Sequence, residues 1–394
     1  MDPHEYCIMR ILIHALSVKQ RGGSDRHLGN FLPALEMIEN INEYFLYVDE
    51  DYPIGQRARN IHVTQLSVNS PARRLWWDQV TLPRIAREQH IDLIVALLSF
   101  GSARPPCPQI AYLRNPLHCP YYLRGLSRVE KMNVQLRRYF LYLTLKASRL
   151  IVTPSAAARE MVRAVHPDLS FERFRILPHG FDKQTLTPPA DLPAHIAAQW
   201  PVADDNCLKI LYVGHILPYK GFDAVLDAAI SLKRQAVQFK MFLTIGPEDG
   251  RDGFERWQTQ VRRHNLSDQL IALGKVPKSA VGSLYDRSDL LIFPSLCETF
   301  GWPIIEAMSF GLPIVAADTL LTREMAGDAA LYYPPFDGVS AAAAIQRIQS
   351  DSKLYAAMRQ AGLTRGARHI GWKEYAERSV AYFAEAVAKA AARG

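Results

Sequence analysis

The sequence contains few cysteines and no long uninterrupted hydrophobic run. Its 394 residues include five cysteines, scattered without a C-x-x-C pair, which argues against a zinc site or a disulfide framework and fits a reducing cytoplasm. No apolar run approaches the ~18 residues that a membrane-spanning helix needs. Arg10 and His14 interrupt the apolar stretch near the N-terminus, so we interpret it as a first strand rather than a secretory signal.

The sequence also lacks a block of like charge and any internal repeat. It has 46 Lys and Arg against 39 Asp and Glu, a net charge of +7 that is spread along the chain. This balance suits a phosphorylated small substrate or an anionic membrane face as well as nucleic acid. A nucleic-acid-binding protein should carry a clustered basic stripe or a known module. The sequence has neither, so we expect no nucleic-acid partner.

Short apolar runs alternate with helix-like stretches along most of the chain. The runs of the second half are continuous, which is typical of strands buried on both faces of a parallel sheet. The alternation therefore predicts an α/β fold of doubly wound units. The predicted strands are 7–17, 44–49, 61–67, 91–100, 109–115, 150–154 and 174–178 in the first half, and 208–214, 239–246, 269–276, 289–294, 312–317 and 330–333 in the second.

The chain is too long for one ordinary hydrophobic core, so we expect two domains. Residues 185–205 contain four prolines and no strong strand pattern, and we place the linker there. This gives an N-terminal domain over 1–184 and a C-terminal domain over 206–371. Residues 372–394 form an Ala-rich helical pattern that can pack back towards the N-terminal domain.

Two strand-to-helix turns carry candidate anion-binding groups, because ligands of open parallel sheets bind beyond the carboxyl ends of the strands. Gly22 and Gly23 follow the first strand, and their backbone N–H groups can hold an anion; a flexible turn is the alternative. Lys220 lies just ahead of a helix, where a cation opposes the helix dipole unless a diphosphate lies between them. A solvated surface lysine is the alternative there.

The stretch CETFGWPIIEAMSFG contains two acids, Glu298 and Glu306, directly after the strand 289–294. Pro303 suits the first turn of a helix and Gly311 its end. Glu298 would then lie in the loop and Glu306 in the first helical turn, both facing the ligand. A carboxylate accepts hydrogen bonds from two neighbouring hydroxyls, as in a ribose or a sugar. For Glu306, an ordinary first-turn charge is the alternative.

The residues between these acids open the same helix. The backbone N–H groups of Thr299, Phe300 and Gly301 precede its N-terminus and can receive phosphate or sugar oxygens. The acidic run at residues 49–51 has the form of a D-x-D metal motif, but a short acidic run matches by chance too easily. We interpret it as a solvated turn and predict no metal site.

Four sequence segments together resemble a known family. They are the E-x7-E pattern of Glu298 and Glu306 with FG after the first acid, GLPIVAAD after the second, LYVGHILPYKG around Lys220, and ILPHGFD before the linker. The chain resembles the retaining nucleotide-sugar glycosyltransferases of family 4, which have the GT-B fold of two Rossmann-like domains facing a cleft. The match is specific over about 208–345 and holds only in outline in the N-terminal domain.

The resemblance implies roles for these residues. Glu298 would hold the hydroxyls of the donor sugar and Glu306 the ribose. Lys220 would neutralise the diphosphate, and Gly22 and Gly23 would meet the phosphates from the other domain.

Five further residues are less clearly matched. His215 is expected to bind the donor, but it stands where the family usually has arginine, and this change weakens one phosphate contact. Asn115 and His118 both lie near the expected position of a sugar-contacting histidine, and a structural role for His118 is the alternative. Lys275 and Val276 would lie near the nucleotide base.

The function implied by the resemblance is the transfer of a hexose-type sugar from a UDP- or GDP-sugar to a hydroxyl of a glycan or lipid-linked acceptor. The expected setting is bacterial cell-surface polysaccharide or glycolipid synthesis. Anomeric configuration would be retained, and no metal or other cofactor would be required. The alternatives are a nucleotide-sugar epimerase of similar architecture and a catalytically silent sugar-binding homologue.

Residues 129–149 are basic and aromatic, and include Lys131, Arg137, Arg138 and Lys146. They form a basic amphipathic helical pattern, which can lie on anionic lipid. An ordinary core helix with a charged outer face is the alternative. We therefore expect a cytoplasmic protein with possible peripheral contact at the inner face of the plasma membrane.

Overall fold

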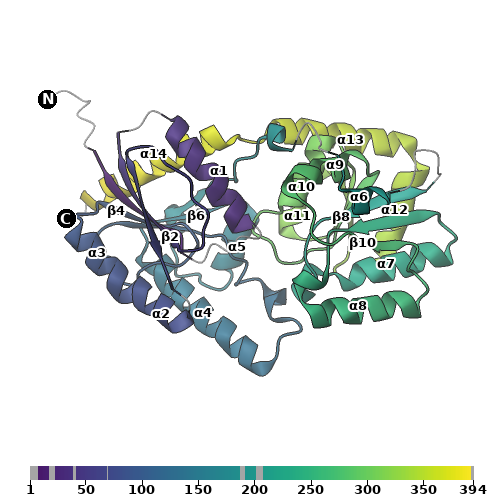
Figure 1. Ribbon diagram of the computed structural model, residues 1–394, viewed down its shortest axis with the longest axis horizontal. Helices are drawn as coiled ribbons and strands as arrows, with labels where there is room; N and C mark the ends of the chain where they lie inside the picture. Colours follow the sequence, from purple (N-terminus) through teal and green to yellow (C-terminus); the bar gives the residue numbers. More distant parts are fainter. Residues whose placement is uncertain are drawn as a thin grey trace. The chain divides into compact units, whose positions relative to one another are not determined.

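The computed structural model describes residues 8–16, 23–38, 41–68, 70–186, 191–200 and 207–391. The chain divides into two compact units (Figure 1). Unit 1 contains the chain up to Cys119, Leu126–Gly180 and the chain from Ile370 onward. Unit 2 contains Pro120–Gly125 and Phe181–His369, so the chain enters unit 2 twice.

Unit 1 is built on a seven-stranded parallel sheet in the order β3-β2-β1-β4-β5-β6-β7. The strands predicted for the first half of the chain are all confirmed, most of them with shorter bounds. They are β1 (Arg10–His14), β2 (Glu43–Asp49), β3 (Ile61–Leu66), β4 (Leu93–Ala96), β5 (Gln109–Tyr112), β6 (Leu150–Thr153) and β7 (Phe174–Ile176). The longer helical elements are α1 (Gly23–Met37), α2 (Pro71–Trp76), the π-helical η1 (Trp77–Thr81), α3 (Leu82–Glu88), α4 (Arg128–Ala147), α5 (Ala156–Arg163) and α14 (Trp372–Ala391).

Unit 2 is built on a six-stranded parallel sheet in the order β10-β9-β8-β11-β12-β13, and its predicted strands are confirmed as well. The strands are β8 (Leu208–Tyr212), β9 (Phe239–Leu243), β10 (Leu270–Ala272), β11 (Leu290–Phe293), β12 (Ile314–Ala317) and β13 (Ala330–Tyr333). The helices are α6 (Ala194–Ala197), α7 (Asp223–Arg234), α8 (Arg251–Arg263), α9 (Val281–Asp286), α10 (Trp302–Phe310), α11 (Leu320–Ala326), α12 (Gly338–Ser350) and α13 (Ser352–Ala367).

Strand β11 explains why continuous apolar runs predicted these strands well. Leu290 and Ile292 pack into one hydrophobic core of unit 2, and Leu291 and Phe293 pack into the core on the other face of the sheet. Because successive strand residues point to opposite faces, a strand covered on both sides needs apolar residues at every position.

The end of the chain belongs to unit 1, where α14 packs beside α1. His27 of α1 contributes to this contact, with its Nε2 atom 2.8 Å from the hydroxyl of Tyr375 and its ring edge-on to Trp372. Both aromatic side chains are buried. An aromatic cluster with one internal hydrogen bond therefore attaches the last helix to this unit.

Residues in the range expected to be a linker contribute to the core of unit 2. Leu192, Ile196 and Trp200 are buried there, and the Trp200 ring stacks on Phe242 at 3.8 Å between ring centroids. The described part of this range therefore contains a short packed helix, α6, which begins after Pro193.

Cysteine pairing differs from the expectation. Of the described cysteines, Cys107 and Cys207 are free, whereas Cys119 and Cys297 are disulfide-bonded. The prediction of cysteines without disulfides is therefore wrong for the latter two. No helix within the described residues has the length and hydrophobicity to cross a membrane.

Candidate functional site

The candidate residues of unit 2 gather at the carboxyl edge of its sheet. Lys220 follows β8 and Glu298 follows β11, and these two strands are neighbours in the sheet. The order of the sheet reverses between them, because β9 and β10 extend to one side of β8 and β12 and β13 to the other side of β11. In open α/β sheets this reversal is where ligands bind.

The turn that carries Lys220 is pressed against the loop after β11. Lys220 ends the 3-10 turn η5 (Pro218–Lys220), and Gly221 follows with a φ of 65°. A Cβ atom at Gly221 would clash with the carbonyl oxygen of Pro294, so only glycine suits both the backbone angle and the close approach. The backbone N–H of Leu296 also donates to the carbonyl of Tyr219 over 3.2 Å. These contacts bring Lys220 to Glu298.

Lys220 and Glu298 form an ion pair in this structure. The Nζ atom of Lys220 donates to Oε1 of Glu298, and the hydroxyl of Ser295 donates to the same oxygen over 3.0 Å. The side chains of the pair are only 19% and 17% exposed. Because charged groups lose hydration when they are buried, each side chain depends on the other for its charge to be tolerated. The site thus holds one cation and one hydrogen-bond-accepting carboxylate side by side.

The start of α10 has the predicted helix signals. Pro303 lies in its first turn, Gly311 follows its end with a φ of 70°, and Gly301 precedes it with a φ of 79°. Phe300 is buried in the core of unit 2, with its ring centroid 5.0 Å from that of Trp302. The side chain of Phe300 is therefore structural. A ligand would meet this segment, including buried Thr299, through the backbone at the helix N-terminus.

Glu306 differs from the prediction. It lies in the second turn of α10, and no acid lies in the first turn. Its side chain is buried, with the residue 3% exposed, and the hydroxyl of Tyr285 donates to its Oε2 atom over 2.6 Å. The prediction that Glu306 lies in the first helical turn and faces an open ligand site is therefore wrong. Because α10 is apolar on most sides, it is buried, and Glu306 is buried with it. Reasoning from the sequence missed Tyr285, because nothing in the short helix α9 marks it as a partner of an acid.

His215 also has a partner that the sequence analysis missed. Its Nδ1 atom is hydrogen-bonded to Oδ1 of Asp249, a residue of the 3-10 turn η6 (Pro247–Asp249) after β9. The backbone carbonyl of His215 accepts a hydrogen bond from the hydroxyl of Tyr212 over 2.9 Å. Asp249 follows the strand beside β8, and this position was a signal available in the sequence. The two bonds hold the imidazole at the same sheet edge as Lys220.

The loop after β10 reaches the same edge. Lys275 is exposed, and Val276 is partly buried against the core. Gly274, with a φ of 66°, turns the chain here, and its N–H donates to the carbonyl of Ile245 over 2.9 Å. A role of Lys275 and Val276 in base binding stays a prediction.

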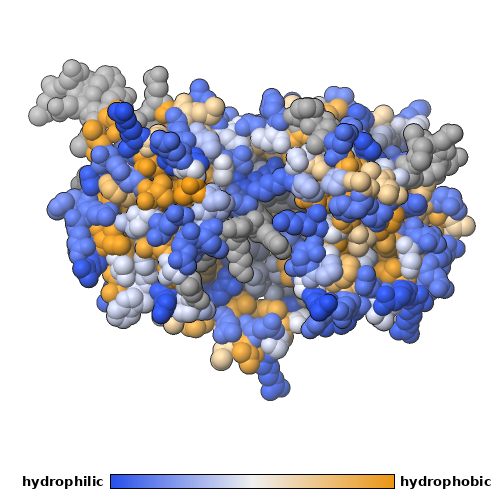
Figure 2. Space-filling view, in the orientation of Figure 1, coloured by the Kyte–Doolittle hydropathy of each residue, from blue (hydrophilic) through white to orange (hydrophobic). Residues whose placement is uncertain are grey.

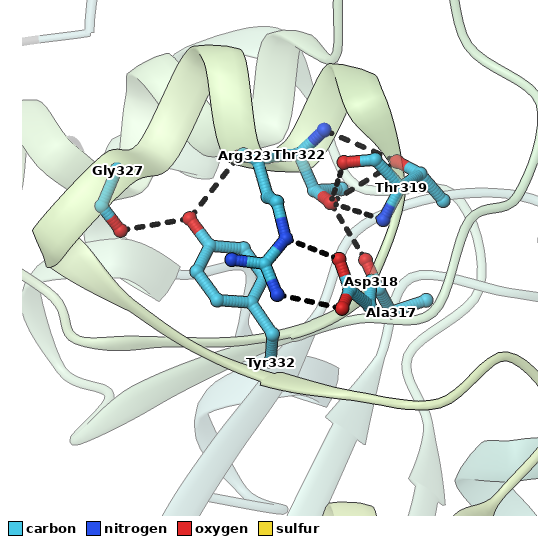
Figure 3. Close-up of polar contacts among 7 residues, drawn as sticks. All are labelled: Ala317, Asp318, Thr319, Thr322, Arg323, Gly327 and Tyr332. Carbon is cyan, nitrogen blue, oxygen red and sulfur yellow. Dashed lines mark hydrogen bonds and ion pairs between the residues drawn. The ribbon is translucent and has the colours of Figure 1, made fainter.

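The carboxyl end of β12, next to the Glu298 loop, is held by a polar network (Figure 3). Arg323 binds Asp318 through both carboxylate oxygens at 2.5 and 2.6 Å and lies over the ring of Tyr332. Tyr332 in turn donates to the carbonyl of Gly327 over 2.7 Å, and Thr322 donates to that of Ala317 over 2.6 Å. These bonds fix the carboxyl end of β12 beside the Glu298 loop.

In unit 1, Gly23 is the first residue of α1, while Gly22 lies outside the described residues. Asn115 follows β5 and is partly buried. His118 is buried, and its Nε2 atom lies 3.0 Å from Nε2 of His166. Burial, followed by the nearby His166 and Arg138, lowers the pKa of His118 to about 4. This geometry supports the structural interpretation of His118.

No group of acidic, histidine or cysteine side chains within the described ranges could hold a metal ion. The acidic run at residues 49–51 therefore joins no such group there.

Comparison with known proteins follows the division of the chain. Residues 21–185 match the family described as Glycosyltransferase Family 4, and residues 199–365 match Glycosyl transferases group 1. The chain belongs to the family 4 glycosyltransferases.

Curated relatives agree with this family. A D-inositol 3-phosphate glycosyltransferase of Streptomyces bingchenggensis is 26% identical over 258 residues, covering 61% of this chain and 53% of the relative. O-antigen chain mannosyltransferase B of Escherichia coli is 31% identical over 167 residues, covering 41% of this chain and 42% of the relative. The chain thus spans about half the length of these relatives.

Solved structures share the fold over nearly the whole chain. Sucrose-phosphate synthase of Thermosynechococcus elongatus has a TM-score of 0.73 at 19% identity and covers 97% of this chain and 100% of its own. HepE of Anabaena, solved in complex with UDP and glucose, has a TM-score of 0.70 at 16% identity and covers 96% and 100%. At these identities the likeness concerns the GT-B fold.

Proposed function

We propose that this protein transfers a hexose-type sugar from a UDP- or GDP-sugar to a hydroxyl of a glycan or lipid-linked acceptor, with retention of anomeric configuration. The observation that carries the proposal is the pair of Lys220 and Glu298 at the strand-order reversal of unit 2. A diphosphate needs a cation and a sugar needs a hydrogen-bond acceptor, and this pair supplies both. The names of both relatives support transfer of a sugar, and that of the O-antigen chain mannosyltransferase supports a role in polysaccharide synthesis.

Donor binding in this proposal separates the ion pair. The diphosphate takes the ammonium group of Lys220, and the sugar hydroxyls donate to the carboxylate of Glu298. Both charged groups then exchange one partner for another, so neither is left buried alone. Glu306, enclosed with Tyr285, would reach the ribose only after a local movement of α10 or its neighbours.

The reaction breaks the bond between the anomeric carbon and the diphosphate oxygen and forms a bond from that carbon to the acceptor oxygen. The acceptor hydroxyl attacks from the face that the diphosphate leaves, and its proton passes to the departing phosphate. Negative charge grows on the diphosphate, where Lys220 and the N-terminus of α10 stabilise it. Glu298 binds the sugar and does not attack it, and the proposed reaction requires no metal or cofactor.

The test is a panel of UDP- and GDP-sugars, with nucleotide release measured with and without lipid-linked acceptors. Lys220→Ala should lower kcat more than it weakens donor binding, because the lysine meets the charge that develops in the transition state. Lys353→Ala, at an exposed position of α13, is the matched control. Unchanged turnover in Lys220→Ala would refute the clamp. Donor binding without release from any donor would favour the silent homologue, and an altered sugar without transfer would favour an epimerase.

We further propose that α4 contacts an anionic membrane. Its outer side exposes four large apolar residues, each between 55% and 66% exposed: Val129, Met132, Leu136 and Tyr139. At 100° per residue they form one stripe facing away from the buried residues Val134, Leu141 and Leu145. Figure 2 has orange surface on the projecting part of this helix. A surface helix needs only one apolar side to pack against the core of its unit. A second, exposed apolar side therefore indicates contact with an apolar partner.

Basic residues near the stripe favour anionic lipid as the partner. Arg128, Lys131 and Arg137 are exposed in the N-terminal half of α4. Arg138, in contrast, is used within unit 1, where its guanidinium donates to the carbonyls of Leu117 and Cys119. The membrane contact therefore rests on the stripe and these exposed cations, and it would place the protein at the inner face of the plasma membrane.

Co-sedimentation with phosphatidylglycerol vesicles tests this contact. Met132→Ser with Leu136→Ser should reduce binding strongly, and Lys131→Glu with Arg137→Glu should make the remaining binding weak and insensitive to salt. Leu320→Ser is the matched control, because Leu320 is an exposed apolar residue of unit 2. Equal binding of all variants would contradict the proposal.

A further inference from the structure

A short segment from the first half of the chain is built into unit 2. The chain leaves unit 1 after Cys119, contributes Pro120–Gly125 to unit 2 and re-enters unit 1 at Leu126. We call Pro120–Gly125 the clasp. Its first four residues form the 3-10 turn η2 (Pro120–Leu123), which packs against η5, the turn that carries Lys220.

The first anchor of the clasp lies directly before Lys220. The ring of Tyr122 stacks on that of Tyr219, with 4.8 Å between ring centroids and 18° between the planes. Tyr219 is also the residue whose carbonyl accepts the N–H of Leu296 from the loop after β11. Tyr122 therefore presses on the residue that joins η5 to the Glu298 loop.

The second anchor lies three residues after Lys220. Arg124 forms an ion pair at 3.4 Å with Asp223, which is in the first turn of α7. The guanidinium carbon of Arg124 also lies 3.8 Å from the ring centroid of Phe336, and Tyr121 meets the same ring edge-on at 5.6 Å. The ion pair by itself is exposed and weak. The aromatic contacts on Phe336 make Arg124 a fixed point rather than a mobile surface side chain.

The two anchors enclose the turn that carries Lys220. Tyr219 and Asp223 lie on either side of Lys220 in the sequence, and the turn itself is one 3-10 turn followed by a glycine with a φ of 65°. A single such turn has few hydrogen bonds of its own, and a lysine has a long flexible stem. The position of the ammonium group therefore depends on what holds the turn.

We propose that Tyr122 and Arg124 are positioning residues for Lys220, and that the clasp sets the place of the ammonium group relative to the diphosphate. This inference rests on the proposed function of Lys220. A misplacement of about 1 Å of a group that acts in the transition state can cost on the order of 100-fold in rate. Loss of one anchor should therefore lower kcat while leaving most of the donor affinity.

The experiment measures nucleotide release by the full chain for the donor that the wild type uses best. Tyr122→Ala should lower kcat roughly tenfold with little change in KM, and Tyr122→Phe should restore it, because the stack needs the ring and not the hydroxyl. Arg124→Lys should fall between Arg124→Ala and wild type, since it keeps the charge and loses the planar stack. Phe171→Ala, at an exposed aromatic residue of unit 1, is the control.

A double-mutant cycle separates positioning from a general loss of structure. In a Lys220→Ala background, Tyr122→Ala should have almost no further effect on kcat, because the group that it positions is gone. A full, additive loss in that background would contradict the proposal, and so would a wild-type kcat in Tyr122→Ala.

Hydrogen exchange keeps this inference separate from the proposed function. The backbone amides of residues 219–223 should exchange faster in Tyr122→Ala than in the wild type, while those of β8 stay protected. This readout needs no donor turnover. If the wild type turned over no donor, the proposed function would fail. Faster exchange in Tyr122→Ala would still show that the clasp holds η5. Unchanged exchange in Tyr122→Ala would refute the role of the clasp. Arg124→Lys serves where the alanine variants do not fold.

Discussion

The ion pair between Lys220 and Glu298 leads to an unusual prediction for donor and product binding. In the structure Lys220 is held by Glu298, so a bare nucleoside diphosphate must compete with a carboxylate for the ammonium group. A nucleotide sugar gains a compensating contact, because its hydroxyls can donate to the released Glu298. Glu298→Gln should therefore bind UDP or GDP more tightly than the wild type and bind the nucleotide sugar more weakly.

The size of the gain follows from the exposure of the pair. A hydrogen bond to a charged group contributes about 1.5–3 kcal/mol, and an exposed ion pair about 0.2–1 kcal/mol. The two side chains are 19% and 17% exposed, which is between these cases. We therefore expect about 1 kcal/mol, or roughly a fivefold lower Kd for the bare diphosphate. Loss of like-charge repulsion between Glu298 and the phosphates acts in the same direction.

Titration calorimetry with UDP, GDP and the preferred nucleotide sugar measures this effect. Ser295→Ala is the matched control, because it removes a hydrogen bond to the same oxygen of Glu298 without changing its charge. Adding Lys220→Ala to Glu298→Gln should abolish the gain. If Glu298→Gln bound the bare diphosphate no more tightly than the wild type, Glu298 would not restrain Lys220 and the argument would fail.

Three further predictions concern stability and the turn at the site. Tyr285→Phe removes the buried donor to Glu306 and should lower the free energy of unfolding by about 1–3 kcal/mol, measured by urea denaturation; no loss would mean that Glu306 has adequate partners without it. Gly221→Ala should lower kcat strongly and Tm only slightly, because its Cβ atom would push η5 away from Pro294. Steady-state kinetics and a thermal melt measure the two effects, and a wild-type kcat would contradict this prediction. The pKa of His118 is about 4 in the folded chain and 6.5 as its ordinary value, so the unfolded chain takes up the proton first as pH falls. Stability should therefore decline from pH 6.5 towards pH 4 by up to about 3 kcal/mol from this residue, and His118→Gln should flatten that decline.

Local sequence predicted those features that depend only on residues within one element. Pro303 and Gly311 predicted the ends of α10, because a fixed φ suits a first helical turn and a left-handed residue suits a helix end. The same local logic placed Glu306 one turn too early and facing outward. Its burial depends on which side of α10 meets α9, and that is a property of packing.

Local sequence patterns were enough to predict the strands, the α/β class and the positions of Glu298 and Lys220 after strand ends, because apolar runs and turn residues act over a few neighbouring positions. Tertiary structure alone decided the partners. Lys220 and Glu298 are 78 residues apart, and Arg124 and Asp223 are 99 residues apart. The first pair forms because parallel strands bring their carboxyl ends to one edge of the sheet, and the second because a segment from the first half of the chain enters unit 2. Local sequence periodicity predicts neither contact.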